Sequence, residues 1–177
     1  MQYFIGVVPS DEYKKKIIGF QQKWKNHWIT DVVEPHITLK AQGGLIPDKE
    51  WIIKVKEICN NFSPFTITVN KPIFFGEDIL YLSATSKELY KLHLNAVEKI
   101  SPSDDLIKKY FELDDFTPHM TLGKTSFGLS KQELQEMAKL AEEELSPYPT
   151  IEVNFIRIYQ EVEPLKYVKY LDIPLSK

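Results

Sequence analysis

The stretches EPHITLK at residues 34–40 and TPHMTLGK at residues 117–124 share one frame, which reads proline, histidine, any residue, threonine, leucine. The 177 residues contain only four histidines, and two of these four lie in this repeated frame. Proline restricts the residue before it to extended geometry, and β-branched or apolar residues follow each histidine. The repeat therefore predicts two β-strands that present the same side chains.

The repeated frame places its polar residues on one face of each strand. In a strand, side chains two residues apart point the same way, so His36 projects with Thr38 and His119 projects with Thr121. The residues that directly follow these four are isoleucine, leucine and methionine. Each strand is thus expected to have an apolar back suited to burial and a front with one imidazole and one hydroxyl.

Two such fronts facing each other would fit acid–base chemistry on a phosphate. An imidazole titrates near pH 6.5, so one ring of a pair can accept a proton while the other donates one. Threonine hydroxyls can donate hydrogen bonds to phosphate oxygens. We therefore assign catalysis to His36 and His119 and phosphate binding to Thr38 and Thr121. This chemistry requires no metal and no cofactor.

Two alternatives compete with this interpretation. One His-x-Thr in a strand is usually structural, but packing alone does not favour a histidine–threonine face in two copies. A zinc site would need a third protein ligand, and the chain has neither an HExxH stretch nor paired cysteines. Zinc would also leave the two threonines without a role, so no metal ligands are assigned.

Composition limits the classes of partner. The chain is 43% hydrophobic and 27% charged, with a formal net charge of −3, which offers no global field for long nucleic acid. The single cysteine, Cys59, excludes an internal disulfide, and we expect it to be buried. No secretory signal or membrane-spanning run is evident. We expect a cytosolic monomer that acts on a small nucleotide or an RNA terminus, with neither long duplex nucleic acid nor a membrane as partner.

The order of elements predicts an α+β fold. Strands are expected at 3–9, 32–41, 65–76, 79–85, 117–124, 150–160 and 167–175, and helices at 11–28, 48–62, 87–100 and 131–145. The expected helix caps are Ser10, Asp48, Ser86 and a capping box of Ser130 with Glu133. Residues 101–115 are expected to form a polar connector. Each repeated strand belongs to a group of strands and two helices, which predicts two similar lobes with antiparallel-rich sheets.

PHITL and PHMTL resemble the paired His-x-Thr-x signatures of the 2H phosphoesterase superfamily, which includes bacterial 2′-5′ RNA ligases and RNA 2′,3′-cyclic phosphodiesterases. The resemblance covers most of the chain, including GEDILYLSATSKELYKLH in the centre and FIRIYQEVEP with YLDIPL near the end. It implies one bilobal domain over residues 1–177, with a pseudo-twofold relation and a motif strand from each lobe beside a central cleft. It also implies that His36 is the proton donor and His119 the proton acceptor, and that cyclic phosphates or 2′-5′ linkages are the substrates.

Two positions depart from the ligase branch that the chain resembles. Lys124 stands five residues after the second histidine, where an arginine is frequent, and it keeps the charge but loses the bidentate fork. Glu161 stands where ligase-like members carry a serine, and a carboxylate near the cleft would repel RNA phosphates. These departures argue against ligation and leave phosphoester hydrolysis as the predicted activity.

Two lysines are further candidates for phosphate binding. Lys40 lies four residues after His36, so strand parity predicts that it shares the imidazole face, either to bind phosphate or to reach solvent at the strand end. Lys124 is out of parity with His119 unless Gly123 kinks the strand.

Three other side chains receive structural roles first. His27 is expected at a helix end and His93 partly buried on a helix. Tyr159 is expected to pack rather than to stack on a base. A binding module that keeps the pocket but has little turnover stays open as the alternative to an enzyme.

Overall fold

The computed structural model describes all of residues 1–177 and has an α+β fold, as predicted. Its strands are β1 (Tyr3–Val7), β2 (Ile37–Lys40), β3 (Phe65–Phe75), β4 (Ile79–Thr85), β5 (His119–Lys124), β6 (Thr150–Val153), β7 (Phe155–Glu163) and β8 (Lys166–Pro174). Its helices are α1 (Asp11–Gln21), α2 (Trp51–Asn60), α3 (Lys87–Ile100), α4 (Asp104–Lys109) and α5 (Lys131–Glu144), with three short 3-10 turns, η1 (Ile29–Asp31), η2 (Leu113–Asp115) and η3 (Thr125–Phe127).

The strands form two four-stranded sheets in which every pairing is antiparallel. One sheet has the order β2-β1-β7-β8 and the other has the order β5-β4-β3-β6. The strand with the first motif is at an edge of one sheet, and the strand with the second motif is at an edge of the other. An edge strand leaves one side unpaired, so both motifs lie where a ligand can approach.

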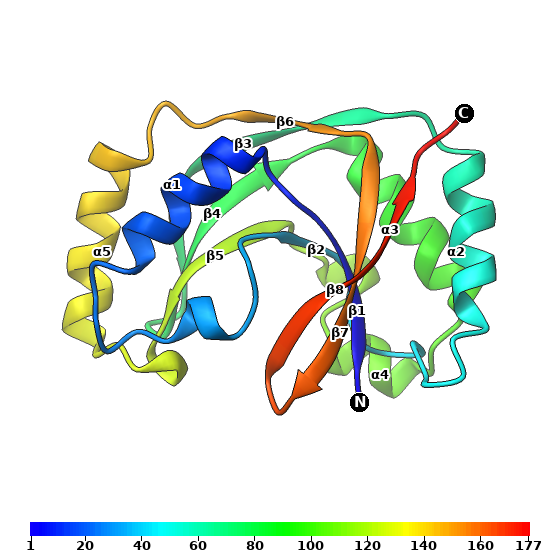
Figure 1. Ribbon diagram of the computed structural model, residues 1–177, viewed down its shortest axis with the longest axis horizontal. Coiled ribbons are helices and arrows are strands. Elements are labelled where there is room, and N and C mark those ends of the chain that lie inside the picture. The colour runs from blue at the N-terminus through cyan, green and yellow to red at the C-terminus, as the bar shows by residue number, and fades with distance from the viewer.

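The two repeated units are consecutive in sequence, but each sheet combines strands from separate parts of the chain. The runs β1-α1-β2-α2 and β4-α3-α4-β5-α5 each contain one motif strand. Strands β7 and β8, from the end of the chain, complete the sheet of the first unit, whereas β3 and β6 complete the sheet of the second. Each sheet thus takes strands from outside its own unit, and the first sheet joins strands from both ends of the chain (Figure 1).

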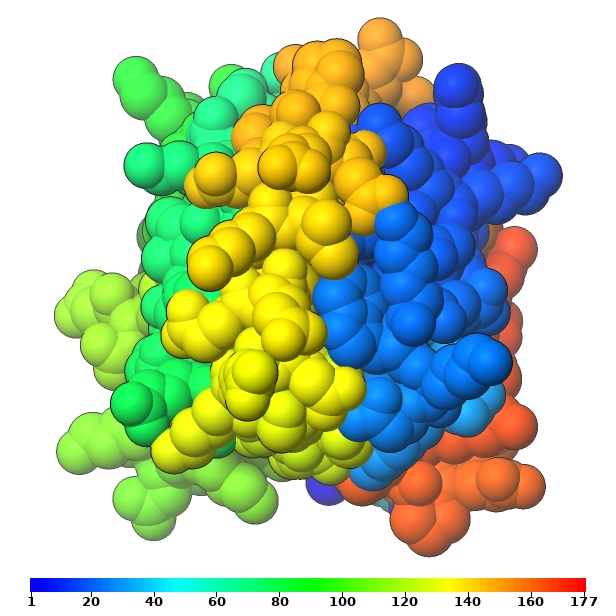
Figure 2. Space-filling model, turned by 90° about the vertical axis from the view of Figure 1, so that its left-hand side faces the viewer, coloured from blue at the N-terminus to red at the C-terminus, as the bar shows by residue number.

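The helices lie at opposite ends of the molecule (Figure 1). Helix α1 lies against β5 and α5 packs on β3, β4 and β5, whereas α3 packs on β2 and α2 packs on α3 and β8. The first helix thus contacts the second sheet, which ties the two units together. Figure 2 shows the outer face of one end, where the yellow side chains of α5 lie between those of the N-terminal segment in blue and the central strands in green.

The back of each motif strand is in the core. Ile37, Leu39, Met120 and Leu122 are all fully buried and belong to one cluster of 34 buried apolar residues. The two histidines and the two threonines are only partly buried. The predicted division into an apolar back and a polar front is confirmed.

Most predicted helix starts are correct and one is wrong. The hydroxyls of Ser10 and Ser86 accept backbone N–H bonds of their first turns, and Ser130 with Glu133 forms the expected capping box. Asp48 does not cap α2, which begins at Trp51. The Asp48 carboxylate instead accepts a hydrogen bond from the N–H of Glu50 in the preceding turn.

Helix α1 ends at residue 21 rather than at residue 28. The buried Gln21 side chain donates to the carbonyls of Thr121 and Leu122, and the N–H of Trp28 donates to the carbonyl of Phe127. These bonds draw residues 22–28 out of the helix and along the segment that follows β5. None of the helices is long and apolar enough to cross a membrane.

The predicted polar connector contains a short helix, α4. Ser103 caps it, two aspartates begin it and two lysines end it, which is the charge order that the helix dipole favours. No side chain of its six residues is buried, so the apolar periodicity that reveals a helix in a sequence is absent.

Candidate active site

The two motifs meet at one cavity. A cavity of about 480 Å³ is lined by His36 and Thr38 from the first motif and by His119 and Thr121 from the second. Histidines 83 positions apart in sequence, one directly before the edge strand β2 and the other at the start of the edge strand β5, therefore face one space. A cavity of this size accommodates a small ligand, and both imidazoles can reach it.

Each imidazole is held by the same local hydrogen bond. The Nδ1 of His36 lies 2.8 Å from the carbonyl oxygen of Glu34, and the Nδ1 of His119 lies 2.7 Å from that of Thr117. A carbonyl can only accept, so each Nδ1 carries the proton. The Nε2 of each ring makes no hydrogen bond within the protein, which leaves it available to accept a proton from a ligand or to return one.

The ring of His36 also packs on a pair of stacked aromatic side chains. Phe4 of β1 and Tyr159 of β7 are paired in register and stack with their ring centroids 4.7 Å apart. The His36 ring centroid lies 5.0 Å from that of Phe4 and 5.4 Å from that of Tyr159. Such contacts restrict the rotation of the imidazole.

The ring of His119 has an equivalent pair on the other sheet. Phe75 of β3 and Tyr81 of β4 stack at 4.2 Å, and each ring centroid lies 5.3 Å from that of His119. Sequence reasoning did not find either aromatic pair, because aromatic residues at strand positions are common and each pair lies far in sequence from the histidine that it contacts.

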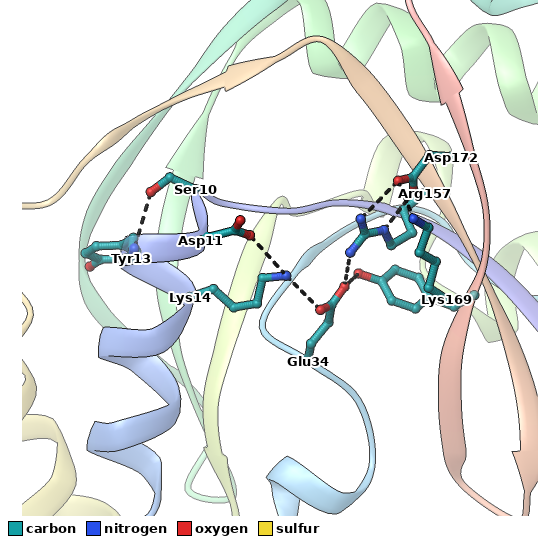
Figure 3. Close-up of polar contacts among 9 residues, drawn as sticks. Ser10, Asp11, Tyr13, Lys14, Glu34, Arg157, Lys169 and Asp172 are labelled. Carbon is teal, nitrogen blue, oxygen red and sulfur yellow. Dashed lines mark hydrogen bonds and ion pairs between the residues drawn. The ribbon is translucent and has the colours of Figure 1, made fainter.

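Glu34, whose carbonyl orients His36, has its own side chain held by a network of charged groups (Figure 3). One Glu34 carboxylate oxygen accepts from Lys14 at 2.8 Å, and the other accepts from Arg157 at 2.6 Å and from the Tyr159 hydroxyl at 2.9 Å. Arg157 in turn forms a bidentate pair with Asp172 at 2.7 and 3.0 Å. The Lys14 and Arg157 bonds hold the pKa of Glu34 below its usual value against the opposing effect of burial.

The environment of the two imidazoles favours their neutral forms. Burial, together with the nearby charges of His119 and Lys124, lowers the pKa of His36 to about 4. Burial is also the main cause that lowers the pKa of His119, again with a contribution from Lys124. Both rings are therefore mainly neutral at pH 7 in the free protein, and a negative charge between them would favour protonation.

A model of the family described as the 2′-5′ RNA ligase superfamily matches residues 9–162. The chain belongs to the 2′-5′ RNA ligase superfamily. A search of curated proteins finds no significant match. Solved structures with a similar fold include TT0787 of Thermus thermophilus (14% identity, TM-score 0.61) and Escherichia coli LigT complexed with 3′-AMP (15% identity, TM-score 0.61). A structure described as a phosphoesterase is also similar (14% identity, TM-score 0.60). Each alignment covers 99% of this chain and 98% of the other.

Both motif strands of this superfamily member carry a β-bulge directly after the threonine. The register on β1 and on β4 shifts so that Leu39 and Leu122 are each one residue in excess of the partner strand. An extra residue resets the alternation of faces, so the residue five places after each histidine, rather than four, returns to the imidazole face. The chain repeats this bulge along with the motif.

The bulge explains where the two candidate lysines lie. Lys124, five residues after His119, lines the cavity with both motifs. Its position does not depend on a kink at Gly123. A Cβ at Gly123 would lie 2.6 Å from the sulfur of Met137, so this glycine is required for the close approach of α5.

Lys40 does not line the cavity, and it does not reach solvent either. It is fully buried, and its ammonium donates to the carbonyls of Ala41 (2.8 Å) and Gly43 (2.7 Å) and to the carboxylate of Glu112 (2.9 Å). All three of its donors are used, so none is left for a substrate. The expectation failed because strand parity was counted across the bulge.

Two residues near the end of the chain lie behind the cavity or outside it. Tyr159 is fully buried behind His36 and cannot stack on a base. The Glu161 carboxylate accepts from the N–H of Leu165 in the β7–β8 turn and does not line the cavity. The expected repulsion of RNA phosphates by Glu161 stays a prediction, because its charge raises the pKa of Tyr167, which does line the cavity.

The remaining histidines and the cysteine are structural. His93 is buried, more completely than expected. His27 is buried and lies beyond the end of α1, because this helix ends earlier than predicted. Cys59 is buried, as predicted, and burial raises its pKa to about 12.

Proposed function

We propose that the protein is a metal-independent phosphoesterase that acts on a 2′,3′-cyclic phosphate or a 2′-5′ phosphodiester at a nucleotide or an RNA end. The observation that supports this most directly is the single cavity lined by His36, Thr38, His119 and Thr121. Membership of the 2′-5′ RNA ligase superfamily and the similarity to a structure described as a phosphoesterase support the same class of activity. The related LigT has been solved with 3′-AMP and with ATP, which supports a small nucleotide as ligand.

In the proposed reaction, the two imidazoles act on opposite sides of one phosphorus atom. The Nε2 of His119 removes a proton from water as its oxygen bonds to phosphorus, and the bond from phosphorus to the ribose 3′ oxygen breaks. The Nε2 of His36 gives its proton to that oxygen, so the products are a 2′-phosphate and a 3′-hydroxyl. The assignment of donor and acceptor follows the family resemblance, and the roles exchange in the reverse direction.

The phosphate itself completes the required protonation state. His36 is neutral in the free protein at pH 7, so it must gain a proton before it can act as the acid. An anion in the cavity raises the pKa of both imidazoles and offsets the positive charge of Lys124, which lowers them in the free protein. Thr38, Thr121 and Lys124 donate to the oxygen atoms that do not react.

One observation favours the alternative, a binding module with little turnover. A pair of neutral imidazoles supplies no acid, whereas Thr38, Thr121 and Lys124 can still donate hydrogen bonds to a phosphate. The same cavity would then bind a nucleoside 2′-phosphate without converting the cyclic compound. The two functions differ in turnover and not in the location of the ligand.

The test is a panel of four nucleoside 2′,3′-cyclic phosphates and short RNAs with cyclic or 2′-5′ ends, each incubated with and without EDTA. The proposal predicts formation of a 2′-phosphate at a rate that EDTA leaves unchanged within about 2-fold. Binding of the 2′-phosphate without conversion of any cyclic compound would establish the binding module instead. Loss of activity on chelation would contradict metal independence.

A further inference from the structure

A second cavity adjoins the first on the side of His119. It measures about 380 Å³ and shares Thr38, His119 and Lys124 with the cavity that both motifs line. Its other walls are largely apolar and aromatic and include Phe75 and Phe116. A substituent on a phosphate held between the histidines would therefore enter an aromatic compartment.

Phe111 lies at the junction of the two cavities and lines both. Its side chain is 69% exposed, the largest exposed fraction of any large apolar residue in the chain. Its backbone has a φ of 54°, which is unfavourable for a bulky residue. Strained backbone and an exposed aromatic ring are both costly, and they occur together where a ligand makes use of them.

Buried hydrogen bonds of the two residues after Phe111 hold its loop in place. The next residue, Glu112, is buried, and its carboxylate accepts from the Lys40 ammonium at 2.9 Å and from the N–H of Ala41 at 3.3 Å. The N–H of Leu113 donates to Nε2 of the buried His93, whose Nδ1 donates to the carbonyl of Leu39. Two buried polar side chains that the reaction does not use thus attach this loop to the first motif strand.

The charges around this second cavity define what can enter it. Glu112 and Asp115 line it, and Lys124, which already serves the phosphate, is its only basic residue apart from histidine. A further phosphate group would meet the Asp115 carboxylate and no second free cation, because Glu112 is already paired with Lys40, whereas a planar uncharged ring would meet aromatic faces. The compartment is therefore suited to an aromatic base and unsuited to a continuing RNA backbone.

We propose that Phe111 is the stacking platform for the nucleobase of the substrate, and that the Lys40–Glu112 pair holds this platform over the cleft. This inference rests on the proposed function and narrows its substrate class. It requires a base next to the reacting phosphate and disfavours base-free cyclic phosphodiesters.

The test compares Phe111→Asn with Phe111→Tyr on two substrates. Asparagine removes the ring and tolerates a positive φ, so the melting temperature should be unchanged or higher. Tyrosine keeps the ring. The substrates are adenosine 2′,3′-cyclic phosphate and the cyclic phosphate of a methyl riboside, which lacks the base. Ile53→Ala is the matched control, because Ile53 is an exposed apolar residue on α2 that lines neither cavity.

For Phe111→Asn we expect the KM for the adenosine compound to rise roughly 10-fold, the size of one base–aromatic contact, with kcat changed little. The KM for the base-free compound should stay the same, and Phe111→Tyr and Ile53→Ala should behave like the original protein. An unchanged KM for the adenosine compound in Phe111→Asn would overturn the inference, as would an equal rise for both substrates.

If the proposed function is wrong and the protein has no turnover, the stacking role of Phe111 can still be tested by binding. If the unaltered protein converts neither substrate, calorimetry with adenosine 2′-phosphate decides the inference by itself. A roughly 10-fold weaker affinity in Phe111→Asn would then support the stacking platform in a binding module. An unchanged affinity would overturn it.

Discussion

The two halves of the candidate site use the same five-residue frame in different surroundings. In both, Nδ1 of the histidine donates to the carbonyl two residues earlier, a pair of stacked aromatic rings packs on the imidazole, and a bulge follows the threonine. These shared features follow from the repeated frame and from the neighbouring strands. They set the orientation of each ring.

The halves differ in how firmly that orientation is held. Around His36, Phe4 and Tyr159 are buried, and the charge network clamps the side chain of Glu34. Around His119, Phe75 is 37% exposed and faces the second cavity, and the residue in the position of Glu34 is the exposed Thr117. One half therefore holds its imidazole rigidly, whereas the other half is open and adjoins the second cavity.

The largest expected effect tests what the halves have in common. His36→Ala and His119→Ala should each lower kcat/KM by about 10²–10⁴-fold, because each removes one proton transfer. The double variant should lose little more than either single variant, since the two rings act as a unit. Steady-state kinetics on a cyclic nucleotide measures this, with the melting temperature as the check on folding. If either variant kept most of its activity, the paired mechanism would be wrong.

A smaller effect tests how the halves differ. Glu34→Ala and Thr117→Ala both keep the backbone carbonyl that orients the ring, but only the first releases a clamped side chain. We expect Glu34→Ala to lower kcat roughly 10-fold, as small misplacements of catalytic groups do, and Thr117→Ala to change it less than about 2-fold.

The pH profile separates this positioning role from a loss of stability. The Glu34 charge raises the pKa of His36. In Glu34→Ala this pKa should fall, so the limb of the kcat–pH profile that depends on His36 should move to lower pH. Glu34→Gln keeps hydrogen-bonding capacity for Arg157 and Tyr159 and should restore most of kcat. Equal losses in Glu34→Ala and Thr117→Ala would show that the charge network contributes nothing to catalysis.

The sequence predicted what local rules determine. The apolar backs of the motif strands, the serine caps of α1, α3 and α5, and the α+β class all followed from periodicity and capping chemistry. The juxtaposition of the two histidines was inferred from the repeat, since nothing within either stretch indicates a partner 83 residues away.

The failures arose where tertiary contacts override local pattern. The bulges depend on pairing with β1 and β4, so strand parity alone assigned Lys40 to the wrong face and left Lys124 unresolved. The charge network joins α1, the segment before β2, and strands β7 and β8, which no local pattern connects. Helix α1 was predicted too long because its end is set by bonds to the segment that follows β5.

The most direct test of the central claim is an NMR titration of the His36 and His119 rings with and without adenosine 2′-phosphate. In the free protein both should titrate below pH 6.5, His36 near pH 4. Because the protonated rings bind the anion better, the account predicts that the ligand raises both pKa values and that affinity increases as pH falls toward the pKa values of the free protein. If only one ring responded, or neither did, the two histidines would not face one phosphate.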